Sequence, residues 1–505
     1  MSHATTPQAP VLRATRLRLH AQHQAVAVMR TDCHVCRAEG LAPRSQVLVS
    51  ANGREVYALL YQTDDPRAPL DQVALSEAAW EALGIEEGAP VRVRHAPLPA
   101  SLGHVRRRLR GQRLDAADFT AIVGDAVRGR YTDVQLAAFL AATATLPLDV
   151  QEIIHLTRAM VEAGRRLSWP GRPVVDKHCV GGLPGNRTTP IVVAIAAANG
   201  LVMPKTSSRA ITSPAGTADT MATLTPVALD ADTLHRVVER HGGCLAWGGA
   251  MRLSPADDLF VRIGRELDID TEGQMIASIL SKKIAAGATH VVIDIPVGPT
   301  AKVRNHDEAA HLAACMEQVA DHFGLHLRCL FTDGSQPVGR GIGPALEARD
   351  VLAVLQGAAD APADLRERAT LVAGAVLEIG GAAGPGQGQA LALRTLEDGR
   401  AWARFQAICL AQGGLFTPPR ATYVETLAAP IPGTVTAIDN RRLSRLAKLA
   451  GAPQSPAAGV RLQVRLGDAV RAGQPLLQLH AQSPGELAYA LDYFHSAGPI
   501  ITVAG

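Results

Sequence analysis

The segment from Asp176 to Thr220 limits the folds open to this chain more than any other part of it. It follows two valines typical of a buried strand, and three glycines within residues 181–185 then allow a tight turn. Thr188 and Thr189 precede the apolar run 191–198, which predicts a packed helix. Because a helix N-terminus presents free N–H groups, this strand–loop–helix arrangement predicts an anion site.

A second cluster of hydroxyl side chains follows the predicted helix. Its members are Thr206, Ser207, Ser208, Thr212, Ser213 and Thr217. With Lys177 and Arg209 as cations, two such loops facing one another predict a phosphate site. The first loop is not a Walker loop, since no Gly-Lys-Ser/Thr closes it, and it lacks the Gly-x-Gly-x-x-Gly fingerprint of dinucleotide sites.

These motifs resemble the phosphate site of the thymidine/pyrimidine-nucleoside phosphorylase family. In that family a Lys-His-Ser segment, a later hydroxyl pair, a Ser close to an Arg and a Thr before an acidic residue surround phosphate. The corresponding residues here are Lys177, His178, Cys179, Thr188, Thr189, Ser207, Arg209, Thr217 and Asp219. The form SSRAITSPAGTADT is especially similar to the AMP phosphorylase branch of the family.

The resemblance implies that five side chains bind phosphate. They are Lys177, Cys179, Thr189, Ser207 and Thr217. Cys179 departs from the family, which usually has a Ser at this position, and a thiol donates more weakly than a hydroxyl. Either a backbone N–H takes over this contact, or the affinity for phosphate is reduced.

Two residues are expected to take part in the chemistry at the base. The resemblance places His178 against the base, and its near-neutral pKa would let it donate a proton or a hydrogen bond to a pyrimidine carbonyl. Asp270, in LDIDTEGQ, resembles the acid of AMP phosphorylases that protonates a purine nitrogen. This role requires burial that raises the pKa of the carboxyl group, and a solvated loop aspartate is the alternative.

The resemblance also implies a set of nucleoside and nucleotide contacts. Ser278 and Lys282 resemble the residues that bind the pyrimidine in thymidine phosphorylases, and Arg265 is the candidate for the base-binding arginine. Lys302 resembles a nucleotide-binding lysine of AMP phosphorylases. The other implied contacts are Gly182, Ser208, Arg209, Ala210, Ile211, Thr212 and Ser213.

The chain is long enough for several domains, with 505 residues, and its helical and strand patterns alternate. The resemblance implies an α/β fold of the nucleoside phosphorylase type II kind, with a helical domain and a large mixed-sheet α/β domain. A small β-rich N-terminal domain is added, as in AMP phosphorylases. The expected bounds are 1–98 for the N-terminal domain, 99–168 with 253–285 for the helical domain, 169–252 with 286–422 for the α/β domain, and 423–505 for a C-terminal β-rich module.

Composition narrows the function classes. The net charge is +3 with both signs interspersed, which argues against nucleic-acid binding, and the basic run 106–110 is expected on the wet face of a helix. Neither a transmembrane stretch nor a secretory signal is apparent, so a cytoplasmic protein is expected. Cys33 and Cys36 form a CxxC without a second pair, which favours free thiols over a metal site.

The expected activity is therefore phosphorolysis of the N-glycosidic bond of a nucleoside or a nucleoside 5′-monophosphate. Phosphate would be a co-substrate, no metal or cofactor is expected, and the family suggests a homodimer or a larger homo-oligomer. Thymidine or uridine and AMP remain alternative substrates. Two further alternatives are a phosphoribosyltransferase, for which Asp257 and Asp258 could bind magnesium pyrophosphate, and a non-enzymatic relative.

Overall fold

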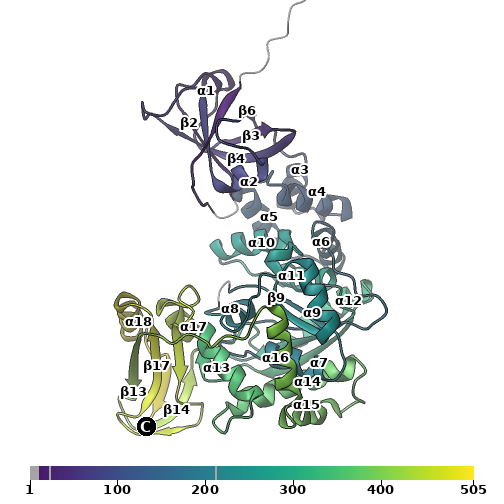
Figure 1. Cartoon of the computed structure of the whole chain (residues 1–505), viewed down its shortest axis with the longest axis vertical. Coiled ribbons are helices and arrows are strands. Elements are labelled where there is room, and N and C mark those ends of the chain that lie inside the picture. The colour runs from purple at the N-terminus through teal and green to yellow at the C-terminus, as the bar shows by residue number, and fades with distance from the viewer. Residues whose placement is uncertain (1–10, 22–23, 211–212) are drawn as a thin grey trace, which may run out of the picture. The chain divides into compact units, whose positions relative to one another are not determined.

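The computed structural model describes residues 11–21, 24–210 and 213–505 (Figure 1). The chain forms two compact units, and the division between them lies after Ala142. The first unit therefore holds part of the helical region in addition to the β-rich N-terminal part. Among the described residues, none of the helices is both long and apolar enough to cross a membrane.

The first unit begins with a closed six-stranded barrel of strand order β1-β5-β2-β4-β3-β6. The strands are β1 (Leu12–Arg16), β2 (Val26–Arg30), β3 (Gln46–Ala51), β4 (Arg54–Thr63), β5 (Gln72–Leu75) and β6 (Pro90–His95). Two pairs, β1 with β5 and β2 with β4, are parallel, whereas the other pairs are antiparallel. Closure leaves no unpaired sheet edge. The short helices α1 (His34–Glu39) and α2 (Glu77–Leu83) complete its core.

Three helices follow the barrel: α3 (Leu102–Leu109), α4 (Ala116–Val127) and α5 (Asp133–Thr145). Asp115 begins α4 with a capping box, because its side chain accepts from the N–H of Asp118 while the Asp118 carboxylate accepts in return. The expected wet face of α3 is correct for Arg106 and Arg107 but wrong for Arg108, which is buried. Arg108 lies three residues after the buried Val105, on the same helical face.

The central sheet of the second unit is parallel, with the order β11-β10-β7, and a second parallel pair, β8-β9, continues it. A bridge between Val174 and Val202 joins the two parts. The strands are β7 (Val175–Cys179), β8 (Met203–Ser207), β9 (Gly243–Trp247), β10 (His290–Val297) and β11 (His326–Asp333). Because all five strands run in the same direction, their carboxyl ends meet at one edge, where α/β proteins place ligands.

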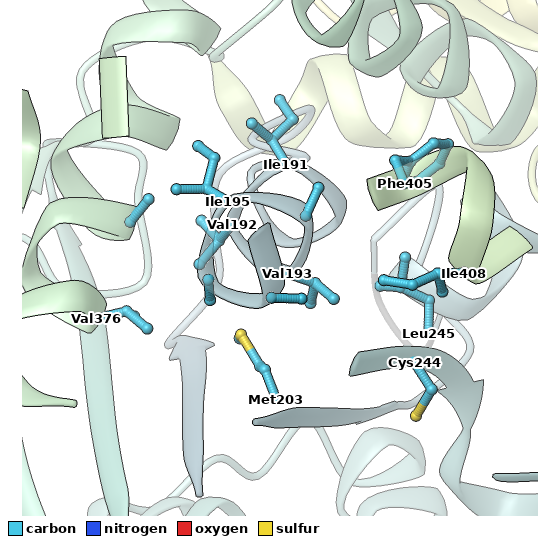
Figure 2. Packing of buried hydrophobic residues seen from close by; sticks show 14 of the residues in the cluster. Ile191, Val192, Val193, Ile195, Met203, Cys244, Leu245, Val376, Phe405 and Ile408 are labelled. Carbon is cyan, nitrogen blue, oxygen red and sulfur yellow. The ribbon is translucent and has the colours of Figure 1, made fainter. Parts of the chain in front are cut away.

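Helix α7 (Thr189–Ala198) is the centre of the main core and is buried on all sides. Figure 2 shows its isoleucines and valines between Met203 of β8, Leu245 of β9 and side chains of two helices, Val376 and Phe405. The helices around the sheet are α8 (Thr217–Ala222), α9 (Ala231–His241), α12 (His306–His322), α13 (Pro344–Leu355), α14 (Ala363–Ile379), α15 (Gly388–Glu397) and α16 (Arg400–Gln412). A helix that is apolar on every side is buried on every side. The burial of α7 therefore holds its first residues, Thr188 and Thr189, inside the core that covers the sheet.

The helical part of the second unit contains α6 (Val150–Glu162), a 3-10 turn (Gly248–Met251), α10 (Pro255–Glu266) and α11 (Glu272–Ala285). Helix α11 packs against both α6 and α12. Because α6 precedes the first strand of the sheet and α11 follows β9, the helical part is built from two separate stretches of the chain. The ASILSKK run lies on α11, and its buried residues include Ile279, Leu280 and Lys283.

The C-terminal part is β-rich. One antiparallel sheet has the order β12-β15-β17-β13 and a second has the order β16-β14-β18. The strands are β12 (Gly341–Ile342), β13 (Tyr423–Ala428), β14 (Gly433–Ile438), β15 (Gly459–Leu462), β16 (Ala469–Val470), β17 (Pro475–Ala481) and β18 (Ile501–Ala504), accompanied by helices α17 (Asn440–Leu449) and α18 (Pro484–Ser496). Because β12 precedes α13, its pairing with β15 attaches this part to the α/β region.

Candidate functional site

The carboxyl end of β7 carries Lys177, His178 and Cys179, and the glycine-rich turn follows directly. Successive side chains of a strand point to opposite faces, so Lys177 and Cys179 share one face while Asp176 and His178 share the other. The Lys177 side chain is buried, and its Nζ donates to Thr188 Oγ1 at 2.7 Å. Burial lowers the pKa of Lys177. The structure thus brings the predicted lysine to the N-terminal end of α7, where the sequence predicts an anion site.

The glycine turn lies so close to the segment after β10 that no side chain fits. Gly182 has φ +78°, and a Cβ there would lie 2.3 Å from the backbone nitrogen of Lys302. Lys302 Nζ in turn lies 2.7 Å from Asp270 Oδ2. The structure thus brings together Gly182, Lys302 and Asp270, three predicted residues that are far apart in the sequence.

The second hydroxyl loop is closed by Asp219, whose Oδ2 accepts from the N–H groups of Ala210 (2.5 Å) and Gly216 (2.9 Å). Arg209 donates to Asp219 Oδ1 at 3.0 Å, and its guanidinium lies 5.0 Å from the centre of the Trp247 ring. Both contacts position Arg209 at the surface of the loop, where its side chain stays half exposed.

Other predicted members of this loop differ in what they contact. Ser213 Oγ donates to the carbonyl of Ala215 at 2.9 Å, a turn contact. Ser208 approaches Gly216 so closely that a Cβ on Gly216 would lie 2.7 Å from the Ser208 carbonyl oxygen. The predicted contacts Ile211 and Thr212 lie outside the described residues.

Arg187, which the sequence analysis did not select, links the two loops. Its Nη1 donates to Thr217 Oγ1 at 2.8 Å, and its Nη2 donates to the carbonyl of Ala215 at 2.8 Å. Its Nε donates to Glu347 Oε2 at 2.7 Å, and Glu347 is buried. Burial raises the pKa of Glu347, and the Arg187 charge opposes that rise. The sequence offered one sign of this role: Arg187 is a single basic residue between the glycines and the Thr188–Thr189 pair.

A buried charge cluster lies behind β7. The Asp176 carboxylate accepts from Lys205 Nζ at 2.9 Å and from Lys283 Nζ at 2.6 Å. Lys205 Nζ also donates to the Lys177 carbonyl at 2.8 Å. Burial raises the pKa of Asp176, but the two lysines outweigh it, and the pKa lies below its ordinary value. Burial also lowers the pKa of Lys283 to about 7, and the Asp176 carboxylate opposes this effect.

Cys179 lies in a network with Asn186 and the fully buried Asp294. Asn186 Nδ2 donates to Cys179 Sγ (3.4 Å) and to Asp294 Oδ2 (3.3 Å), and Thr332 Oγ1 donates to Asp294 Oδ1 at 2.6 Å. Burial raises the pKa of Cys179 to about 12, so the group is a thiol at neutral pH. It can donate only weakly to a ligand, in agreement with the sequence argument.

Ser207, at the end of β8, is one of the predicted phosphate donors. Its Oγ is buried, and within the part of the chain that the structure describes it has no hydrogen-bond partner. Asn186 Oδ1 is in the same condition. Buried polar atoms are nearly always paired. Of these two atoms only the Ser207 hydroxyl can donate to an anion, because an amide oxygen only accepts. Thr189, another predicted phosphate donor, is the first residue of α7 and is buried.

Ser278 and Lys282 lie together on α11, one turn apart. Lys282 Nζ donates to Ser278 Oγ at 3.2 Å and to Asp257 Oδ2 of α10 at 2.8 Å. Arg265 lies two turns beyond Asp257 on α10, about 12 Å along the axis. It is exposed, and its charge contributes to lowering the pKa of Lys448, after the effect of burial. In this conformation Arg265 is therefore separate from the Ser278–Lys282 pair.

The two predicted chemical groups have unequal surroundings. Burial, followed by the charges of four lysines, holds the pKa of His178 well below its ordinary value. A neutral imidazole can still donate a hydrogen bond, but it is too weak an acid to give up its proton. Of the two roles expected for His178, a hydrogen bond to the base therefore remains and proton donation does not. Asp270 has a side chain that is 58% exposed, so the burial required for its expected role as an acid is not present in this conformation.

Comparison with known proteins places the site in a family. Residues 171–402 match the "Glycosyl transferase family, a/b domain", residues 104–164 match the helical bundle domain of the same family, and residues 434–500 match the "Pyrimidine nucleoside phosphorylase C-terminal domain". The first match contains the Lys177 loop, and the third lies within the C-terminal β-rich part.

Full-length relatives are similar along the whole chain. Proteins named "Putative thymidine phosphorylase" from Tolumonas auensis and Parvibaculum lavamentivorans are each 69% identical over 503 residues, covering 100% of both chains. One from Chelativorans sp. is 66% identical over 498 residues, covering 98% of both chains.

Among solved structures, anthranilate phosphoribosyltransferase from Thermus thermophilus matches with a TM-score of 0.52 and 21% identity, over 61% of this chain and 98% of that chain. This likeness concerns the fold alone, and with the domain matches it confirms the expected fold class of a helical bundle plus an α/β domain. Taken with the full-length relatives, these matches establish that the chain belongs to the pyrimidine nucleoside phosphorylase family.

Proposed function

We propose that the chain catalyses phosphorolysis of the N-glycosidic bond of a nucleoside or a nucleoside 5′-monophosphate. A phosphate oxygen forms a bond to C1′ of the sugar, the bond from C1′ to the base nitrogen breaks, and the base leaves with that electron pair and takes up a proton. The products are a free base and a pentose 1-phosphate, or ribose 1,5-bisphosphate if the substrate is a nucleotide. Phosphate is the co-substrate, and the reaction needs no cofactor.

One observation carries this proposal: the two loops at the carboxyl edge of the sheet hold two basic side chains and one unpaired donor. Lys177 lies at one loop, Arg187 ties that loop to Thr217 of the other, and the Ser207 hydroxyl has no protein partner among the described residues. Preorganised cations and donors of this kind stabilise the charge that develops on a transferred anion. Behind the Lys177 strand, Lys205 and Lys283 both donate to the buried Asp176 carboxylate, and this network holds the end of β7 in place.

The substrate is proposed to be a nucleoside 5′-monophosphate, as in the AMP phosphorylase branch. Lys302 supports this choice, because it lies against the glycine turn through Gly182 and forms an ion pair with Asp270. Lys302 would contact the nucleotide, and Asp270 would protonate the leaving base once substrate replaces solvent around it. Contacts from residues 208–213 would complete the site.

A pyrimidine nucleoside is the second candidate, and the Ser278–Lys282 pair favours it. An ammonium group and a hydroxyl held 3.2 Å apart can bind the carbonyl oxygens of a pyrimidine. The neutral imidazole of His178 would add a hydrogen bond to the base. Asp257, which the phosphoribosyltransferase alternative needs for magnesium, is ion-paired with Lys282.

The test is base release from AMP, thymidine and uridine, measured side by side with phosphate and without added metal. The proposal predicts release that depends on phosphate, with AMP giving the largest kcat/KM. Larger values for thymidine and uridine would move the assignment to the second candidate. Release that requires magnesium pyrophosphate, or no release from any of the three, would contradict the proposal. We also expect a cytoplasmic homodimer or larger homo-oligomer.

A further inference from the structure

Three side chains with metal-binding chemistry meet away from the phosphate loops, where α11 begins beside α12. They are Glu272, His311 and Cys315. His311 and Cys315 are four residues apart on α12, so they lie on the same face of that helix. Glu272 is the first residue of α11. None of the three belongs to the predicted site, and the sequence analysis did not select them because α11 and α12 are separated by β10.

The distances between the three groups are close to those of a metal site. His311 Nε2 lies 3.3 Å from Glu272 Oε1 and 3.8 Å from Cys315 Sγ, and all three ligand atoms lie within 4.8 Å of one another. Tetrahedral zinc with ordinary bond lengths separates its ligand atoms by about 3.3–3.6 Å. A small rotation of the Cys315 or Glu272 side chain would bring the set to that geometry.

We propose that Glu272, His311 and Cys315 bind one zinc-class divalent ion that cross-links α11 and α12. A ligand set with imidazole and thiolate selects zinc or cobalt over magnesium or calcium, which prefer oxygen ligands. Cysteine binds as the thiolate, so its proton passes to solvent when the ion is bound. Water would take the fourth position, because the His311 side chain is 68% exposed. This site departs from the sequence expectation that the chain binds no metal.

The scaffold under the cluster is suited to hold an ion. Leu312 and Met316 of α12 are buried in the core, so their packing holds the helix that carries His311 and Cys315. Glu272 follows Asp270 by two residues. An ion bound here would therefore hold the segment that carries the proposed acid, although the phosphorolysis proposal does not depend on it. The alternative is that Glu272 and His311 form an ordinary surface ion pair.

The experiment is a Co²⁺ titration of the untagged full-length chain, followed by the near-ultraviolet thiolate-to-cobalt charge-transfer absorption. We expect one ion per chain, displacement by Zn²⁺, loss of the charge-transfer band in Cys315→Ser, and at least about a tenfold weaker affinity in His311→Ala. Matched controls are Cys329→Ser on β11 and His322→Ala at the other end of α12, both of which should bind Co²⁺ like the wild type.

A melting experiment keeps the test decisive if one variant folds poorly. Zn²⁺ should raise the Tm of the wild type by mass action, whereas it should leave the Tm of Cys315→Ser and of Glu272→Gln unchanged. A charge-transfer band that persists in Cys315→Ser, a band lost in Cys329→Ser, or a Zn²⁺-induced rise in Tm that is equal in all variants would overturn the proposal.

Discussion

The two sides of the candidate site differ in how much of their structure is already in place. On the phosphate side, Lys177 and Arg187 are held by buried partners, Thr188 and Glu347. On the nucleotide side, Asp270 and Lys302 form an ion pair with exposed fractions of 58% and 31%. Surface ion pairs contribute little to stability, whereas buried charged networks fix geometry. For the proposed function, this comparison means that the residues proposed to bind phosphate are preorganised, whereas those proposed to bind the nucleotide require substrate to complete their surroundings.

Side chains on opposite faces of β7 explain how one strand contributes both to the proposed phosphate site and to the proposed base site. Lys177 and Cys179 face the start of α7 and the glycine turn, while Asp176 and His178 face the opposite way, and Asp176 contacts Lys283 of α11. His178 therefore shares its face with the helix that carries Ser278 and Lys282. Adjacent residues in one motif can thus contact phosphate and base separately.

The largest effect is expected from the phosphate side. Lys177→Met keeps the length of the side chain but removes the charge, and we expect kcat/KM for phosphate to fall by about 10³-fold, as for loss of a preorganised charge-stabilising group. Lys302→Met is the matched change on the nucleotide side and should lower kcat/KM for AMP far less. Equal losses in the two variants would remove the distinction between the sides.

The buried cluster should matter for stability. Asp176→Asn leaves Lys205 and Lys283 without their carboxylate, and we expect the free energy of unfolding to fall by about 3–5 kcal/mol, measured by urea denaturation. Asp398→Asn removes one partner of an exposed pair with Arg400 and should change stability much less. A wild-type stability for Asp176→Asn would show that the cluster does not support β7.

On the nucleotide side, Asp270→Asn tests the proposed acid. We expect kcat for AMP to fall by about 10²-fold, because general acid catalysis contributes about 10²–10⁴-fold. Asp268→Asn is the control: this neighbouring aspartate is exposed and has φ +51°, a conformation that asparagine tolerates. Equal activity of Asp270→Asn and the control would exclude Asp270 as the acid.

The pH dependence of stability should report on His178. Its pKa in the folded chain lies below the unfolded value of about 6.5, so the unfolded chain binds the extra proton as pH falls. The stability contributed by neutral His178 is present above about pH 6.5 and is lost as pH falls below it. His178→Asn should flatten the pH dependence of the free energy of unfolding between about pH 5 and 7. An unchanged slope would show that the pKa of His178 is the same in the folded and the unfolded chain, which would contradict this prediction.

The smallest effect is expected from Cys179→Ser. A hydroxyl in place of the thiol should bind phosphate better, and we expect KM for phosphate to fall about fivefold, which corresponds to about 1 kcal/mol for one hydrogen bond. Cys329→Ser is the control, since that cysteine lies on β11. A rise in KM for phosphate in Cys179→Ser would show that the thiol has a role of its own.

Sequence reasoning reached the parts of the site that are local in the chain. Lys177, Thr188 and Thr217 stand within one segment, whose glycines and hydroxyls indicated an anion site before any fold was known. It missed Arg187 and Glu347, because their partnership joins positions 160 residues apart. A buried charged residue looks like any other charged residue in the sequence, and only the structure shows the partner that makes its burial possible.

The same limit applies to the fold and to the base side. Short alternating runs predicted a β-rich N-terminal part, but its closure into a barrel with two parallel pairs depends on pairings that local patterns do not encode. Arg265 is selected by its resemblance to a family position, and the structure places it exposed on α10, about 12 Å along the axis from the Asp257 that contacts Lys282. The role expected for Asp270 requires burial, whereas the structure leaves its side chain 58% exposed beside Lys302, a partner that local sequence does not reveal.

The most direct test of the difference between the two sides is calorimetric titration of phosphate into the enzyme without nucleoside or nucleotide. A preorganised phosphate side predicts that the wild type binds phosphate, that Asp270→Asn binds it equally well, and that Lys177→Met loses binding. Absence of phosphate binding by the wild type, or equal loss in Asp270→Asn and Lys177→Met, would contradict the account.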